Sequence, residues 1–141
     1  MFNNTISNQS LSPNFTLAEF THSQMAIERG ILNEPDAEQR EAIGQLVDHL
    51  LQPLRERIGE AIAITSGFRN QEVNRLVGGV PTSQHTKGEA ADCYCASGPE
   101  QLLQVLLESG LPFDQAIVYR RKRFLHLSYR QGRCRKMVLY K

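Results

Sequence analysis

The chain has 141 residues, of which 40% are hydrophobic and 22% charged, and its formal net charge is +1. This length and apolar content fit one globular domain, and the near-neutral charge argues against a surface built throughout for nucleic acid. No apolar run approaches the roughly 18 residues that a membrane-spanning helix needs. We therefore expect a monomer without a membrane span, and nucleic acid is not an expected partner.

The first residues are polar and lack the charged and then apolar pattern of an export signal. We expect synthesis in the cytoplasm without a signal peptide. Residues 1–14 are rich in Asn and Ser, which predicts a flexible arm ahead of a domain over residues 15–141. Cys93 and Cys95 are too close along an extended segment to pair readily, so all three cysteines are expected to be reduced.

Two short helices are predicted at the start of the domain. Thr16 and Glu19 have the spacing of a capping box. Ser23 is a candidate cap for a second helix that Gly30 ends. Between these signals, an apolar clamp is formed by Phe15, Leu17 and Phe20.

The longest periodic stretch covers residues 36–58 and predicts the core helix. Its apolar residues recur at helical spacing on one face. Pro53 lies inside it and predicts a kink or a break one turn before the helix ends at Gly59.

The rest of the chain alternates short strands and helices. A strand is predicted at 61–65, a brief helix before Gly78, a strand at 90–95 and a helix at 99–109. A hairpin around a basic turn and one further strand follow, at 116–119, 124–129 and 137–140. Helices early and strands late predict an α+β fold in which a small antiparallel sheet packs against helices.

The segment from Ser83 to Asp92 contains the first candidate metal ligands. His85 lies in a polar loop, and Asp92 follows seven residues later at the start of an apolar strand. Small residues between them, such as Gly88, allow a close approach of the backbone. A buried carboxylate without a partner is costly, and a cation would remove that cost.

His126 is the third candidate, on a predicted strand among apolar neighbours. Two imidazoles and a carboxylate are a usual ligand set for a catalytic zinc ion, which keeps one position open. The alternative is a core histidine without metal, with Asp92 paired to Arg69 or Lys87. Spacing alone leaves both interpretations open.

The stretch Ser83–Asp92, of the form S-x-H-x-x-G-x-A-x-D, and the later His-Leu-Ser resemble the signature of the zinc D-Ala-D-Ala carboxypeptidases (metallopeptidase family fifteen). Phage L-Ala-D-Glu endolysins are related to them, and Hedgehog domains share the fold. Further similar blocks are Phe15–Phe20, Thr65–Arg69, Asn74–Gly79 and Phe113–Gln115. The resemblance therefore covers nearly everything after the N-terminal arm.

This resemblance implies that His85, Asp92 and His126 hold one zinc ion. It also implies that Arg69 meets a carboxylate or carbonyl oxygen of the substrate, since a guanidinium offers a planar pair of donors. Ser83 and Gln84 would support the loop. The implied activity is hydrolysis of a peptide bond in peptidoglycan stem peptides, in the cell wall or periplasm, which the protein would reach by a phage-type release route.

One feature of the family pattern is missing. In these enzymes a Glu or Asp a few residues before the last His usually acts as general base. Residues 119–125 contain no carboxylate, and the nearest one upstream is Asp114. Without a base the rate typically falls about 10²–10⁴-fold, so the alternative function is a zinc-containing cell-wall binding module with weak or no turnover.

Strand register decides which residue replaces the missing carboxylate. A two-residue turn at Arg121-Lys122 pairs Ile117 with His126 and places Tyr119 on the face of His126. A three-residue loop would instead turn Asp114 to that face. Tyr119 and Asp114 are therefore both candidate catalytic residues.

The C-terminal third is strongly basic, with four consecutive cations at residues 120–123 and more from Arg130 to Lys136. Such turns are commonly only solvated. The functional alternative is docking to an anionic polymer, in the first place a cell-wall glycan with attached acids and in the second place nucleic acid, and either would depend on salt.

Overall fold

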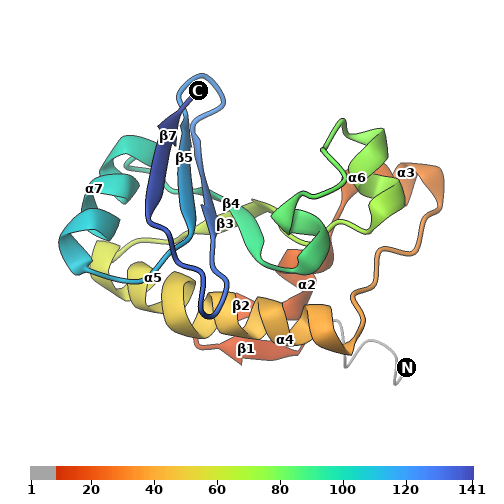
Figure 1. The fold of residues 1–141 in the computed structure, drawn as a ribbon, viewed down its shortest axis with the longest axis horizontal. Helices are drawn as coiled ribbons and strands as arrows, with labels where there is room; N and C mark the ends of the chain where they lie inside the picture. Colours follow the sequence, from red (N-terminus) through yellow and green to blue (C-terminus); the bar gives the residue numbers. More distant parts are fainter. Residues whose placement is uncertain (1–8) are drawn as a thin grey trace.

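A five-stranded sheet forms the centre of the computed structural model, which describes residues 9–141 (Figure 1). In spatial order its strands are β3 (Ala63–Ser66), β4 (Ala90–Tyr94), β6 (Phe124–Ser128), β5 (Gln115–Tyr119) and β7 (Met137–Tyr140). The first four pair antiparallel, and β7 joins β5 in parallel. The predicted α+β class is confirmed, and the parallel edge strand makes the sheet mixed.

A two-stranded antiparallel ribbon precedes the first helix. It consists of β1 (Ser10–Ser12) and β2 (Phe15–Thr16). The hydroxyl of Ser12 donates a hydrogen bond to Oε1 of Gln52 at 2.6 Å, and the amide of Asn14 donates to the same oxygen at 3.1 Å. Residues 10–14 thus differ from the loose arm predicted over 1–14, because their polar groups find partners on a helix. Residues 1–8 of that arm lie outside the described residues.

The short helices follow their local signals. They are α2 (Leu17–Thr21), α3 (Gln24–Arg29) and α6 (Gln71–Leu76). Thr16 and Glu19 form the predicted capping box, in which the amide of Thr16 donates to Oε1 of Glu19 at 2.8 Å. Ser23 caps α3, and Gly30 ends it with a left-handed backbone. The predicted helix α7 (Pro99–Ser109) has the expected bounds.

The long core helix continues through Pro53 without a gap. It consists of α4 (Ala37–Leu46), a π-helical turn η1 (Val47–Leu51) and α5 (Gln52–Ile58). The amide of Gln52 donates to the carbonyl of Val47, five residues earlier. Such a wider turn relieves the conflict between a proline ring and the carbonyl four residues before it. The predicted interruption therefore takes the form of a π turn one turn earlier than expected.

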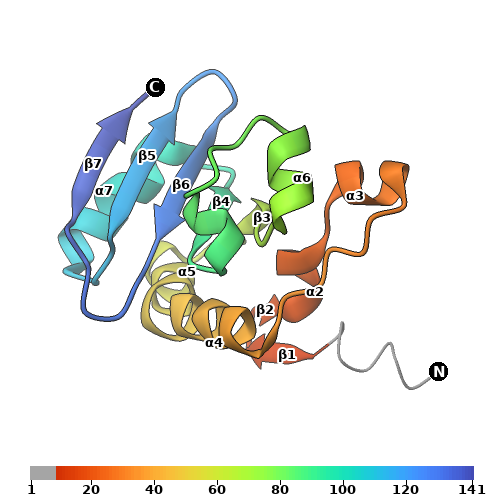
Figure 2. The same cartoon turned by 45° about the vertical axis from the view of Figure 1, so that its right-hand side comes forward.

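Strand alternation separates the core from the site. On β4, β6 and β5, the buried side chains of one face belong to the apolar core, together with the helices (Ala91, Cys93, Leu125, Leu127, Ala116 and Val118). In Figure 2, α7 lies behind the sheet, whereas α6 lies in front of it and to one side. The opposite face of the three strands carries Asp92, His126, Ile117 and Tyr119, which line a cleft. No helix among residues 9–141 combines the length and the apolarity needed to cross a bilayer.

Candidate metal centre

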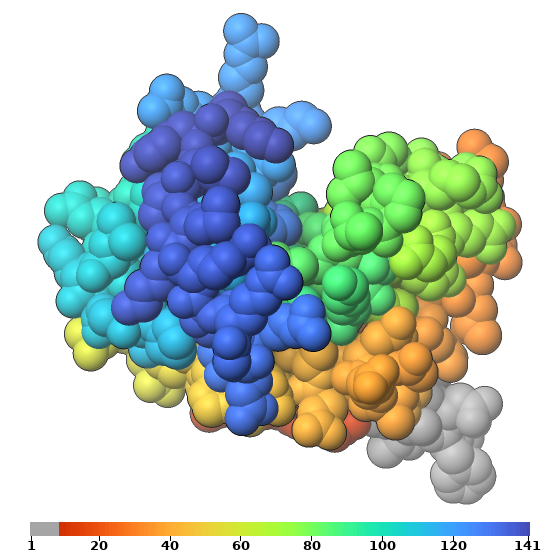
Figure 3. All heavy atoms as spheres, viewed as in Figure 1, coloured from red at the N-terminus to blue at the C-terminus, as the bar shows by residue number. Residues whose placement is uncertain are grey.

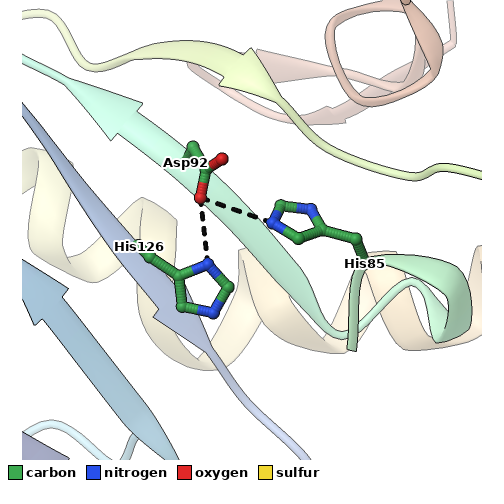
Figure 4. Close-up of side chains that lie close together, drawn as sticks. All are labelled: His85, Asp92 and His126. Carbon is green, nitrogen blue, oxygen red and sulfur yellow. Dashed lines mark hydrogen bonds and ion pairs between the residues drawn. The ribbon is translucent and has the colours of Figure 1, made fainter. Parts of the chain in front are cut away.

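Three side chains from separate elements meet on this face of the sheet (Figure 4). Asp92 of β4 and His126 of β6 are directly paired across the strands. His85 comes from the single-turn 3₁₀ helix η2 (Gln84–Lys87). Oδ1 of Asp92 lies 2.9 Å from Nδ1 of His126 and 3.4 Å from Nε2 of His85. The sequence motif predicted these three residues, and the fold brings them together.

His85 is held in the orientation that a metal ligand needs. Its Nδ1 lies 2.7 Å from the carbonyl oxygen of Gly67. Because a carbonyl oxygen only accepts hydrogen bonds, Nδ1 must carry a proton, and Nε2, the nitrogen that faces Asp92, is the atom left to bind a metal ion. The hydroxyl of Ser83 also accepts a hydrogen bond from the amide of His85 at 3.2 Å, which supports the loop.

The segment around Gly67 depends on two features to which the sequence analysis gave no role: the missing side chain of Gly67 and the side chain of Asn33. A Cβ atom on Gly67 would lie 2.6 Å from the carbonyl oxygen of Phe20, so only glycine fits. The buried amide group of Asn33 donates to the carbonyls of Thr21 and Phe68 at 3.0 and 2.9 Å. Its oxygen accepts from the amide of Asn70 at 2.8 Å. These contacts join distant segments, and no local pattern predicts them.

Asp92 is mostly buried but remains ionised. Burial alone would raise its pKa, but the hydrogen bonds and charges of His126 and His85 outweigh burial and lower the pKa well below its usual range. Among the described residues, the ion pairs of Asp92 are with the two imidazoles and not with Arg69 or Lys87. The ligand atoms of the three residues lie within 4.8 Å of one another. An ionised carboxylate and two imidazoles at this spacing fit one zinc ion.

The three residues lie in a cleft of about 700 Å³. Figure 3 shows it as a hollow between the green residues around α6 and the blue residues of the C-terminal strands. Arg69 is part of its wall. Burial lowers the pKa of the Arg69 guanidinium, and the charge of Asp92 opposes that shift. Nε of Arg69 is buried without a hydrogen-bond partner in the described part of the chain.

Tyr119 also lies in the cleft wall. Ile117 pairs with His126, and Tyr119 pairs with Phe124, in the register that a two-residue turn predicts. The connection is in fact a four-residue loop, in which the amide of Arg123 bonds to the carbonyl of Tyr119. Tyr119 stacks on Phe124, with ring centroids 4.5 Å apart.

Asp114 is fully buried in the same wall, immediately before β5. Its oxygens accept from Nε and Nη2 of Arg135 at 2.6 and 3.0 Å, and from Nε2 of Gln84 at 3.1 Å. The bond to Arg135 is the main reason why the pKa of Asp114 is lowered. Gln84 also donates to Glu89, a cleft residue that the sequence analysis missed, at 3.3 Å.

Comparison with known proteins agrees with this geometry. A family model described as Peptidase M15 matches residues 13–128. No curated protein sequence matches the chain. The matched region spans most of the chain and includes four of the five strands of the sheet, most of the residues that line the cleft and the three candidate ligands. The protein therefore belongs to the M15 peptidases, a zinc-dependent family.

Proposed function

We propose that the protein is a zinc-dependent peptidase that hydrolyses a peptide bond in peptidoglycan stem peptides, as a carboxypeptidase or an endolysin-like enzyme. The observation that carries the proposal is the orientation of the ligand set on the wall of the cleft. His85 is fixed with Nε2 toward Asp92, and Asp92 lies within hydrogen-bond distance of His126. The peptidase family supports a peptide as the substrate.

His85, Asp92 and His126 would hold the zinc ion. When bound at such a site, zinc polarises a carbonyl group and lowers the pKa of water to about 7. Arg69 would bind the terminal carboxylate or the carbonyl oxygen of the substrate. Its buried Nε has no protein partner among the described residues, which leaves a donor for that role.

Tyr119 and Asp114 take different roles in the proposal. We assign Tyr119, on the face of His126, the donation of a hydrogen bond to the oxyanion that develops during hydrolysis. Asp114 is a poor general base, because Arg135 and Gln84 engage both of its oxygens and its pKa is lowered. Its proposed role is structural, because its bonds to Arg135 and Gln84 join two segments of the cleft wall.

A second candidate function is a zinc-containing module that binds cell walls with weak or no turnover. This candidate is favoured because the carboxylates in the cleft already have partners. Asp92 belongs to the ligand set, Asp114 is bound by Arg135, and Glu89 lies 3.7 Å from Nε of Arg130. Every carboxylate that lines the cleft within residues 9–141 therefore has a partner, and that partner competes with a proton for the carboxylate oxygens.

The test is incubation of the zinc-loaded protein with purified peptidoglycan and measurement of new amino and carboxyl termini. We expect release by the parent protein and none by His126→Ala. A matched control is His22→Ala, which makes the same change at an exposed position outside the cleft.

If the fully metallated parent protein releases no termini, hydrolysis is rejected. Sedimentation with cell walls then distinguishes the second candidate, which requires retention at low salt. The release route to the cell wall is part of the proposal, and a lysis assay with protein added from outside tests whether that access is sufficient.

A further inference from the structure

Positive charge is concentrated in the cleft. Its lining contains six cationic residues and three carboxylates, although the whole chain carries a formal charge of only +1. The cationic residues are Arg69, Lys87, Lys122, Arg130, Arg133 and Arg135. A zinc ion would add to this excess, so the cleft favours an anionic ligand.

Three of these arginines come from one short segment, residues 130–135, which lies beyond the part of the chain that the family model matches. The segment is tied to the cleft wall by Asp114. The amide of Arg135 donates to Oδ1 of Asp114 at 3.2 Å, and the amide of Met137 donates to its carbonyl at 2.9 Å. The position of this arginine segment is therefore fixed by a buried anchor.

The three arginines differ in what they bind. Arg135 forms a two-point ion pair with Asp114, and Arg130 lies 3.7 Å from Glu89. Arg133 lines the cleft, is exposed, and has no ion pair with any residue in 9–141. Its amide bonds to the carbonyl of Arg130 at 2.9 Å, so both residues belong to one turn.

We propose that Arg133, assisted by Arg130, forms a second anion subsite, which binds a substrate carboxylate away from the bond that is cut. This inference rests on the proposed function, because it names the substrate class of the same cleft. Arg69 lies between β3 and α6 and serves the group at the metal centre, whereas the arginine segment lies between β6 and β7. The preferred substrate is thus a peptide with an acidic residue in addition to its terminal carboxylate, a condition that the glutamate of a stem peptide meets.

The strength of the preference for a carboxylate depends on how far the paired charges are exposed to solvent. A guanidinium and a carboxylate in contact with solvent gain little from pairing, so we expect a preference of about two- to fivefold in affinity. Salt should reduce this preference, because exposed charges are screened.

The experiment uses two synthetic stem peptides that differ only in whether the glutamate carboxylate is free or amidated. Binding to the full chain is measured by calorimetry after chelation, and cleavage is measured after zinc loading. The test variant is Arg133→Gln. The matched control is Arg57→Gln, which removes an exposed arginine on α5 outside the cleft.

The parent protein and the control should bind the free-acid peptide about two- to fivefold more tightly than the amidated one, and Arg133→Gln should bind both alike. The subsite is rejected if Arg133→Gln keeps the preference for the free-acid peptide. It is also rejected if the parent protein shows no preference or binds neither peptide. A preference without cleavage rejects only the proposed hydrolysis. Cleavage without a preference rejects only the subsite.

Discussion

Replacement of Gly67 by alanine tests how the metal centre is held. The new Cβ would lie 2.6 Å from the carbonyl oxygen of Phe20 and 2.7 Å from the Cα of Phe20, and both of these are backbone atoms. Contact at an ordinary 3.4 Å requires a movement of about 0.8 Å. Because the carbonyl of Gly67 fixes Nδ1 of His85, this movement reaches the ligand. We expect a loss of about 1–3 kcal/mol in unfolding free energy and about a 10–100-fold loss in zinc affinity.

The control for this substitution is Gly44→Ala in the interior of α4. A Cβ there meets no atom within 4 Å, and the same change inside a helix stabilises by about 0.5–1 kcal/mol. Urea unfolding without metal gives the stability, and competition with a chromogenic chelator gives the zinc affinity. If Gly67→Ala matches the parent protein in both measurements, the assignment of Gly67 as the support of His85 is refuted.

Two further substitutions test the surroundings of the centre. Asp114→Asn should lower the unfolding free energy at pH 7 by about 1 kcal/mol, a small value because solvent reaches Arg135 and screens the pair. The folded-state pKa of Asp114 is lowered, so this contribution is present above the usual carboxyl pKa of about 3.9 and is lost as pH falls below it. A difference in urea stability between the parent protein and Asp114→Asn that stays constant down to about pH 2.5 would contradict the assignment. Asn33→Ala should cost about 2–3 kcal/mol, because it leaves two carbonyls and one amide without partners. It should also weaken zinc binding in the same chelator assay, and unchanged affinity would show that Asn33 supports the fold alone.

Local signals predicted much of the fold. Ser23, Gly30, Pro99 and Gly110 mark helix ends through backbone preferences and capping, which depend on a few neighbouring residues. The parallel pairing of β7 and the ribbon strand β1 were not predicted. Both depend on partners distant in sequence, and a short apolar alternation does not say which strand it will join.

The candidate site shows the same division. His85, Asp92 and His126 could be predicted as a candidate ligand set from their resemblance to a family signature, whereas residue types and spacing alone left an interpretation without metal open. The supports from Gly67 and Asn33 could not, since the contacts that define them cross between segments far apart in the chain. The register of Ile117 with His126 was one of two alternatives, and the structure selects it.

The three candidate ligands do not lie on equally stable parts of the fold. Asp92 and His126 belong to neighbouring inner strands, whereas His85 belongs to one isolated helical turn. Opening that turn breaks the bonds of four residues, whereas opening of β4 or β6 breaks pairing with a strand on each side, so the turn should open more often than the sheet. Exchange of the metal with the surroundings would then proceed through release of His85 first, while the other two ligands keep their places. In a chelating buffer, the amides of residues 84–88 should therefore exchange hydrogen for deuterium before those of β4 and β6.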